Sequence, residues 1–290
     1  MKVGVIAAIL VFLTEALRAD GGDWMRGIDG GRSLAAMSIP GTHDAGARFE
    51  PVAGTAKCQE LTISQQLAAG VRFLDIRCRH RGDSFRIHHG AVDQRMDFTE
   101  VQDEVFDFLR RHPGETVIMS VKEEHRPEKN TRGFTATFEA LIAPHQAGWW
   151  LGNHVPRLRE VRGKVVLFRR FRSERKIGID ATDWPDNTRF EKGLLRVQDR
   201  YRVPEVGGKW QAVEAMLLEA GKGAKGRLTL NFTSGYVPRA FGIPDIRAVS
   251  GPVNQKLAAH VRKHPGTSTG VVVMDFITPE LASAIYRRNR

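Results

Sequence analysis

The chain has 290 residues, of which 41% are hydrophobic and 27% are charged, and its formal net charge is +11. This composition excludes an intrinsically disordered chain, and the length suits one large α/β domain or two small ones. The excess of positive charge favours a polyanionic partner: nucleic acid, an anionic membrane surface or a phosphorylated substrate. The sequence has no helix-turn-helix, zinc-finger or RNP-like motif, so we expect no nucleic-acid partner.

Residues 1–19 have the pattern of a secretory signal peptide. A basic residue precedes the apolar run Val3–Leu13, which is too short to span a bilayer, and Ala16 and Ala19 supply small residues near a cleavage point. An uncleaved N-terminal helix is the alternative. We therefore expect a secreted protein in which residues 20–290 form one domain.

The chain has two cysteines, Cys58 and Cys78. In an exported protein an isolated pair suggests one disulfide, while two buried free thiols are equally compatible with the sequence. Neither cysteine stands in a metal-ligand spacing.

Apolar, β-rich runs alternate with helical stretches along the rest of the chain. The eight candidate strands are Leu34–Ser38, Val71–Arg77, Ser84–His88, Thr116–Lys122, Lys164–Arg169, Leu194–Gln198, Arg227–Phe232 and Gly270–Asp275. Several of these runs are almost continuously apolar, as is typical of parallel strands that are buried on both faces.

Helical spacing of apolar residues fills most of the intervals. The predicted helices are Thr99–His112, Trp210–Ala220, Pro252–Lys263 and Pro279–Arg288. Thr99 is the expected N-cap of the first helix, and Pro113 ends it. Strands and helices in this order predict a single distorted (β/α)8 TIM-type barrel, irregular between Arg77 and Ser84, where no helix fits. An open doubly wound sheet is the alternative, but no strand is followed by GxGxxG or a P-loop.

The stretch Ser38–Gly46, SIPGTHDAG, places His43 and Asp44 in a turn after the first strand. Polar or titratable residues also end or follow the other seven strands: Asp75 and Arg77; His89; Lys122, then Glu123 and Glu124; Arg169 and Arg170; Asp199 and Tyr201; Asn231, Thr233 and Ser234; and Asp275. In a (β/α)8 barrel these strand ends open on one face, which carries the catalytic site. Such a ring of residues is hard to explain by packing alone.

Two histidines can act as base and acid near neutral pH, because free imidazole has a pKa of about 6.5. Each needs a carboxylate on its other ring nitrogen, and Asp44 and Asp275 are the candidates. Arg77 offers a bidentate fork for a phosphate. Together these residues indicate a ribonuclease-like cleavage of a phosphodiester, in which an internal hydroxyl attacks phosphorus.

Five motifs in order between Leu34 and Phe171 resemble the X domain of the bacterial phosphatidylinositol-specific phospholipase C family: SIPGTHDAG, GVRFLDIRCR, HHG, ETVIMSVKEE and GKVVLFRR. The resemblance continues more weakly through VQDRY, NFTSG and VVMDF. It implies a distorted TIM barrel that cleaves phosphatidylinositol, and often glycosylphosphatidylinositol (GPI) anchors. The implied products are diacylglycerol and inositol 1,2-cyclic phosphate, formed through the inositol 2-hydroxyl.

The resemblance also implies catalytic roles. It makes His43 the general base with Asp275 as its partner, and His89 the general acid supported by Asp44. His88 is then a bystander at the end of its strand.

Arg77 corresponds to the phosphate ligand, with Asp75 beside it. The expected inositol-binding residues are Lys122, Arg170, Asp199 and Tyr201. Arg169 is an alternative to Arg170 as the inward residue, and Asp199 is equally compatible with a turn cap. The calcium-dependent relatives carry an acidic residue at position 77; an Arg there repels a cation, so we expect no metal and no cofactor.

A lipid substrate requires a membrane interface. The loop 236–244 is apolar and interrupted by Pro and Gly, so Tyr236, Phe241 and Ile243 are candidates for contact with lipid headgroups. Trp149–Trp150 is a second candidate. Ordinary packing over the end of a barrel is the alternative for both.

Two other functions remain open at this point: a metal-dependent, glycerophosphodiesterase-like enzyme, and an inert barrel that binds inositol lipids. Arg77 speaks against the first, and the presence of both His43 and His89 against the second. The expected partners are phosphatidylinositol in membrane surfaces and GPI-anchored proteins, contacted peripherally by a monomer.

Overall fold

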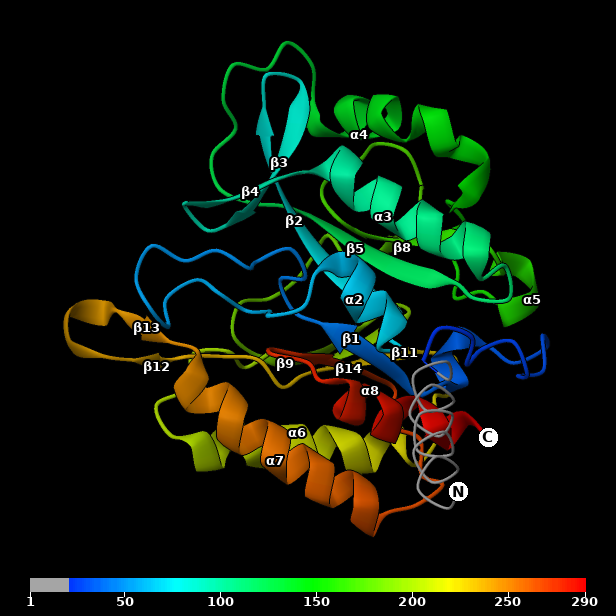
Figure 1. Cartoon of the computed structure of the whole chain (residues 1–290), viewed down its shortest axis with the longest axis vertical. Coiled ribbons are helices and arrows are strands. Elements are labelled where there is room, and N and C mark those ends of the chain that lie inside the picture. The colour runs from blue at the N-terminus through cyan, green and yellow to red at the C-terminus, as the bar shows by residue number, and fades with distance from the viewer. Residues whose placement is uncertain (1–20) are drawn as a thin grey trace, which may run out of the picture.

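The computed structural model describes residues 21–290, so the predicted signal peptide, 1–19, lies outside the described residues. Eight parallel strands lie side by side in chain order (Figure 1). They are β1 (Ile39–Thr42), β2 (Phe73–Arg81), β5 (Val117–Glu123), β7 (Val165–Arg170), β8 (Ile179–Asp180), β10 (Leu195–Gln198), β11 (Leu228–Phe232) and β14 (Val271–Met274).

The barrel is open between β8 and β10. Within the described residues these two strands do not pair, and β9 (Arg189–Lys192) runs antiparallel along the free edge of β10. Two-residue β6 (Trp149–Trp150) adds to β7. The fold is therefore a distorted (β/α)8 barrel with one open seam.

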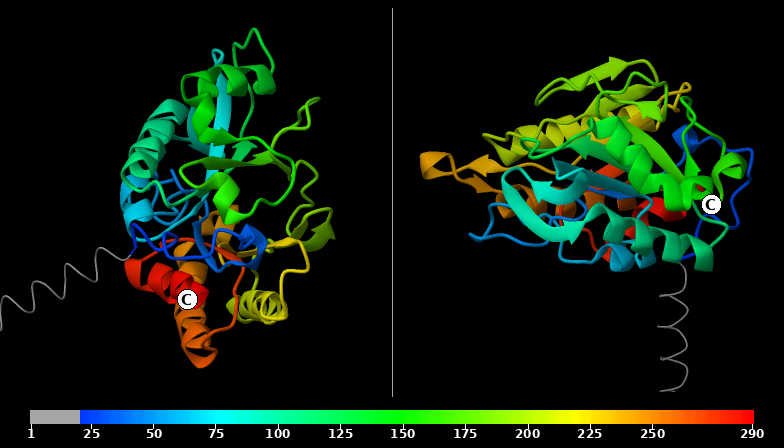
Figure 2. Two further views of the ribbon diagram at one scale, coloured as in Figure 1. Left: turned by 90° about the vertical axis from the view of Figure 1, so that its right-hand side faces the viewer. Right: turned by 90° about the horizontal axis from the view of Figure 1, so that it is seen from above.

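Helices lie on the outside of the strands, as the left view of Figure 2 shows. They are α2 (Ile63–Ala68), α3 (Phe98–Arg111), α4 (Phe134–Ile142), α5 (Leu158–Val161), α6 (Val206–Ala220), α7 (Arg247–Lys263) and α8 (Pro279–Tyr286). Short 3-10 turns occupy Leu34–Ala36, Ala143–Gly148, Ala240–Gly242 and Arg287–Asn289. Among residues 21–290, no helix combines the length and the apolar character that a bilayer crossing requires.

Side chains along each strand point alternately into and out of the barrel, and both sides are buried, which explains the continuous apolar runs. In β14, Val271 and Val273 pack inside the barrel, while Val272 and Met274 pack outward in the cluster that includes helical residues. Each strand therefore buries both faces, because side chains alternate with a period of two. The same alternation decides which polar residues at the strand ends point into the barrel mouth.

Two predicted strands need correction. Residues 34–36 form a 3-10 turn capped by Ser33, and the strand begins only at Ile39. The strand near residue 84, β3 (Ser84–His89), pairs antiparallel with β2 and β4 (Val92–Asp97), so it is not a barrel strand. The barrel instead includes β8, which pairs parallel with β7. Gly82 and Asp83 both have positive φ, 58° and 56°, which suits a tight hairpin turn between β2 and β3.

Helix ends also differ from the predicted ones. Asp97, and not Thr99, caps α3 in a capping box with Glu100. Helices α6 and α7 begin four and five residues before the predicted Trp210 and Pro252, at Val206 and Arg247. Pro252 lies inside α7, so it does not mark the start of the helix.

A buried ion pair ties the N-terminal segment to the closed end of the barrel. Arg72 and Glu115 are both 0% exposed, and Arg72 Nη2 lies 2.8 Å from Glu115 Oε2. The Arg72 guanidinium also donates to the backbone carbonyls of Gly21 and Gly22 at 3.0 and 2.9 Å. The charge is therefore buried with its hydrogen bonds satisfied.

Both cysteines are buried free thiols. Cys78 packs outward from β2 in the hydrophobic core, whereas Cys58 lies in a small separate cluster under the barrel mouth. Of the two alternatives left open by the sequence, the structure has the free thiols.

Candidate active site

Strand alternation places the predicted site residues on one inner face. On β2, Phe73 packs inside the barrel, and Asp75 and Arg77 continue that side of the strand. The same reasoning turns inward the polar residues that end or follow the other strands: His43, Lys122, Arg170, Asp199 and Asp275. They converge on a cavity of ≈ 550 Å³.

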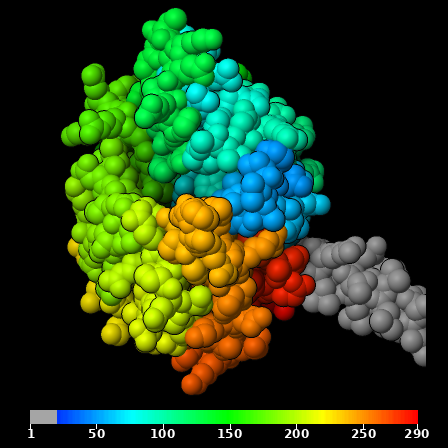
Figure 3. Space-filling model, turned by 90° about the vertical axis from the view of Figure 1, so that its left-hand side faces the viewer, coloured from blue at the N-terminus to red at the C-terminus, as the bar shows by residue number. Residues whose placement is uncertain are grey.

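Figure 3 views this end of the molecule, where a hollow lies beside the projecting lobe, coloured orange, of residues near position 240. The cavity is lined by nine of the predicted residues: His43, Arg77, His89, Lys122, Arg170, Asp199, Tyr201, Tyr236 and Asp275. Its volume is within the usual range for a small-molecule site, about 300–1,000 Å³.

His43 forms a hydrogen bond with Asp275 across two neighbouring strands. His43 Nδ1 lies 2.8 Å from Asp275 Oδ1, and Asp275 is 1% exposed. The side-chain amide of Gln59 donates to the backbone carbonyls of His43 and Met274, both at 2.8 Å, and so holds the two segments together. The pair is thus fixed by buried contacts on both sides.

The environment of His43 raises its pKa above the ordinary value. Burial alone lowers this pKa and Arg77 adds to that effect, but the charge and hydrogen bond of Asp275, with the charge of Asp44, outweigh them. The imidazole is therefore a stronger base than its burial alone would allow.

Arg77 is the centre of the charged network. Its guanidinium lies 2.8 Å from His43 Nε2, 3.1 Å from Asp44 Oδ2 and 3.2 Å from Asp75 Oδ2. Burial lowers the pKa of Arg77, but Asp44 and Asp75 raise it well above its usual value.

Asp75 itself is fully buried and accepts a hydrogen bond from Ser120 Oγ at 3.1 Å. Burial raises its pKa, yet Arg77 and Arg170 bring it below the normal range.

His89 approaches from the β3–β4 hairpin. Its Nδ1 lies 2.7 Å from the carbonyl oxygen of Ala56, which leaves Nε2 toward the site. Asp44 Oδ2 lies 3.7 Å from His89 Nε2 and 3.5 Å from His43 Nε2. The sequence assigned Asp44 to His89 alone; the structure places it between both histidines, with a hydrogen bond to neither. His88 is buried and stacks on His125 away from the cavity.

The inositol-binding candidates line the opposite side of the cavity. Lys122 Nζ donates to Glu124 Oε2 at 2.6 Å. Burial raises the pKa of Glu124, but Arg77 and Lys122 lower it to about 2, so the carboxylate stays ionised. Arg170 stacks on Trp184, with Cζ 3.8 Å from the ring centroid.

Trp184 also donates to Asp199 Oδ2 at 2.9 Å, so Asp199 is a side-chain partner in the site and not a turn cap. The Tyr201 hydroxyl donates to Asp186 Oδ1 at 2.5 Å, and this bond raises the pKa of Tyr201 to about 12. Arg169 points away from the cavity and pairs with Asp180 at 2.9 Å. Arg170 is therefore the inward residue of the two.

Three further residues face this site. Glu124 was among the polar residues expected after the fourth strand, but no role was assigned to it, and the other two were not predicted. Trp184 and Asp186 lie in the irregular segment after β8, which carries no periodic signal. Geometry alone identifies them.

The two interface candidates differ in exposure. Phe241 is 102% exposed and Ile243 46%, on the hairpin between β12 (Val237–Pro238) and β13 (Pro244–Asp245). In Figure 1 this hairpin projects beyond the rest of the molecule. Tyr236 instead lines the cavity. Of the second candidate, Trp149 is 5% exposed and packs on Phe138, so it cannot contact lipid, and Trp150 is partly buried against the barrel interior.

A parallel-stranded barrel whose mouth holds two histidines, their carboxylates and a buried arginine defines a phosphodiester-cleaving enzyme. The resemblance to the bacterial phosphatidylinositol-specific phospholipase C family is confirmed, because residues 38–171 match the model of the phosphatidylinositol-specific phospholipase C X domain.

The chain is similar to the 1-phosphatidylinositol phosphodiesterase of Listeria monocytogenes serovar 1/2a, with 27% identity over 282 residues, which cover 92% of this chain and 84% of the relative. The enzyme of that name from Staphylococcus aureus strain Newman is 28% identical over 287 residues, covering 91% of this chain and 90% of the relative.

Solved structures agree with these relatives. A phosphatidylinositol-specific phospholipase C from Staphylococcus aureus superposes with a TM-score of 0.84 at 28% identity, over 92% of this chain and 98% of that one. The enzyme from Listeria monocytogenes, at 24% identity and a TM-score of 0.77 over 93% of this chain and 99% of that one, shares the fold.

Proposed function

We propose that this protein is a metal-independent phosphatidylinositol-specific phospholipase C, a phosphatidylinositol diacylglycerol-lyase. The observation that carries the proposal is the position of His43, whose Nδ1 is held by Asp275 while Nε2 faces the cavity beside Arg77. The His89 ring lies 6.4 Å away between centroids and almost perpendicular. A phosphodiester between the two rings would meet a base on one side and an acid on the other.

The proposed reaction balances without water. His43 Nε2 takes the proton of the inositol 2-hydroxyl, and the freed oxygen attacks phosphorus. The bond from phosphorus to the glycerol oxygen breaks, and His89 gives that oxygen its proton. The products are diacylglycerol and inositol 1,2-cyclic phosphate, and Arg77 supports the charge on the phosphate oxygens.

Several charged side chains in the cavity support inositol as the headgroup that the site binds. Lys122 and Glu124 face the cavity from β5 and its end, and Asp199 and Arg170 face it beside Trp184. Alternating charged donors and acceptors match a ring of hydroxyl groups, each of which both donates and accepts. The family resemblance, and not these charges, supports a ring without further phosphates.

Metal independence rests on the occupation of the site by a fixed cation. The Arg77 guanidinium already pairs with Asp44 and Asp75. These carboxylates are the oxygen donors that a calcium ion would otherwise use. Arg77 thus supplies the positive charge that a metal supplies elsewhere.

Peripheral membrane contact, secretion and a monomeric state complete the proposal. The exposed Phe241 and Ile243 beside the cavity support the contact with lipid, and the pattern of residues 1–19 supports secretion. GPI-anchored proteins are proposed as further substrates on the same headgroup chemistry. Gel filtration of the purified chain tests the monomeric state, and release of a GPI-anchored reporter from vesicles tests the further substrates.

The test of function is release of diacylglycerol from phosphatidylinositol vesicles in EDTA. We expect turnover on these vesicles and none on phosphatidylcholine vesicles, with kcat/KM about 10²–10⁴-fold lower for His43→Ala. Activity that appears only after addition of a divalent metal would instead support a glycerophosphodiesterase-like enzyme. Binding of the vesicles without turnover would support an inert lipid-binding barrel.

A further inference from the structure

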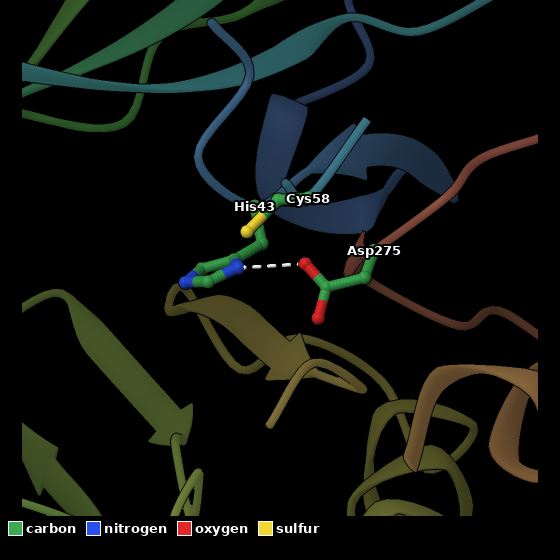
Figure 4. Close-up of side chains that lie close together, drawn as sticks. All are labelled: His43, Cys58 and Asp275. Atoms are coloured by element: carbon green, nitrogen blue, oxygen red, sulfur yellow. Dashed lines mark hydrogen bonds and ion pairs between the residues drawn. The ribbon is translucent and has the colours of Figure 1, made fainter. Parts of the chain in front are cut away.

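Cys58 lies beside the catalytic histidines without a role in the reaction above. Its Sγ is 3.8 Å from His89 Nδ1, and the side chain is 0% exposed. One ligand atom each from His43, Cys58 and Asp275 fall within 4.8 Å of one another (Figure 4). Asp44, Cys58 and His89 form a second such set, so both sets meet at the same sulfur.

We propose that His43, Cys58 and Asp275 form an inhibitory site for a single zinc ion or a similar thiophilic divalent cation. A thiolate, an imidazole and a carboxylate are the three ligand types that zinc takes up in proteins, and the sulfur selects against calcium and magnesium.

The carboxylate of Asp275 is not fully used. Asp275 Oδ1 bonds His43, and Oδ2 is buried without a hydrogen-bond partner among the described residues. In Figure 4 Oδ2 points away from the Cys58 sulfur, so the ion either takes the place of the proton between Oδ1 and His43 or requires the carboxylate to rotate. A tetrahedral zinc with bonds of about 2.0–2.3 Å needs its ligand atoms roughly 3.3–3.7 Å apart. The three side chains therefore need only small shifts to close on an ion.

Arg77, which contacts the other nitrogen of His43, is the cation that an ion here would face. Asp44 and Asp75 already pair with Arg77 at 3.1 and 3.2 Å, and these pairs reduce its repulsion of the ion. The negative charge that the site offers the ion then comes from the Asp275 carboxylate and the Cys58 thiolate. Burial, with Asp275 and Asp44, raises the pKa of the Cys58 thiol, so the ion must displace the thiol proton, which leaves to solvent.

Inhibition follows from the tautomer of His43. Zinc takes the lone pair of Nδ1, so the proton that Nδ1 shared with Asp275 moves to Nε2. A protonated Nε2 can accept neither the hydrogen bond from Arg77 nor the substrate proton. The inhibition rests on the proposed function, whereas binding of the ion does not.

Binding is tested on the full chain, freed of metal, with cobalt as a spectroscopic substitute for zinc. We expect one cobalt per chain and the near-ultraviolet absorption of a cobalt–thiolate bond, displaced by zinc. Cys58→Ser should abolish that absorption and weaken zinc binding at least about tenfold, and Asp275→Asn should also weaken it. Cys78→Ala is the matched control, because Cys78 is equally buried but belongs to neither set, and it should bind like the wild type.

Activity gives the second readout, with each variant compared to its own zinc-free rate. Zinc should inhibit the wild type and Cys78→Ala, and Cys58→Ser should need at least about tenfold more zinc for half inhibition. Equal zinc affinity in Cys58→Ser and the wild type, or no thiolate absorption, would overturn the site. Lack of turnover without zinc would refute the proposed function and leave the absorption result standing.

Discussion

Arg77 Nη2 lies 2.8 Å from His43 Nε2. A guanidinium can only donate, so Nε2 must accept, and the ring proton of neutral His43 must sit on Nδ1, toward Asp275. The two neighbours together fix the tautomer in which Nε2 carries the free lone pair. The substrate must displace Arg77 from that nitrogen, and the phosphate is the group that can draw the guanidinium away.

Replacement of Arg77 by Lys should lower kcat by about 10²–10³-fold, because a point charge cannot replace the fork that spans His43, Asp44 and the phosphate. Steady-state kinetics on a soluble inositol phosphodiester measures the change. Unfolding by urea serves as the control for the fold. An Arg77→Lys enzyme with wild-type kcat would show that the guanidinium has no part in the chemistry.

Asp275→Asn should shift the pH profile. His43 must be unprotonated to act as base, so kcat/KM is present above the raised pKa of His43 and is lost as the pH falls through it. Without the carboxylate, burial and Arg77 lower this pKa, so the acid limb should move to lower pH. The maximal rate should fall by about 10–100-fold, because the ring loses its orienting partner. An acid limb that stays in place would assign it to another group.

The hairpin at the mouth should act in membrane binding and not in chemistry. Phe241→Ser with Ile243→Ser should weaken binding to phosphatidylinositol vesicles at least about tenfold, since each exposed side chain would bury apolar surface worth about 1.5–3 kcal/mol. Leu218→Ser is the matched control, because Leu218 is 51% exposed on α6, far along the chain from the hairpin. Equal losses on vesicles and on the soluble diester would argue against the hairpin as an anchor.

Arg72→Met should lower the free energy of unfolding by about 3–5 kcal/mol, because it leaves Glu115 as a buried charge without its partner. Urea unfolding followed by circular dichroism measures this. Arg110 is 73% exposed and pairs with the exposed Asp107, so Arg110→Met should change stability by about 0.5 kcal/mol or less. Similar effects of both variants would mean that the buried pair is not a structural anchor.

Seven of the eight barrel strands could be read from the sequence, because each is a short apolar run that a polar residue ends. The eighth, β8, has only two residues and no such run, and the hairpin strand β3 was predicted in its place. Which residue of a pair points inward could not be read, because runs such as Val165–Phe168 are apolar on both faces. Arg170 was therefore preferred to Arg169 through the family resemblance alone, until the structure gave the alternation. The helix starts at Val206 and Arg247 carried no clear cap, so they were placed too late.

Contacts in the site between residues far apart in the sequence could be predicted only in part. His43 and Asp275 were paired through the family resemblance, and the neighbouring positions of β1 and β14 explain their contact. The positions of Trp184 and Cys58 at the site were not predicted, because both residues lie outside the strands and are placed by the loops that fold over the mouth. Loop geometry of this kind has no periodic signature in a sequence.

Attack by the inositol 2-hydroxyl under His43 catalysis is tested most directly by the reaction product. Phosphatidylinositol is incubated with the protein in EDTA and followed by phosphorus NMR. We expect the first product to be the five-membered inositol 1,2-cyclic phosphate, and His43→Ala to form none at matched times. Direct appearance of an acyclic inositol phosphate, or a requirement for added metal, would contradict it.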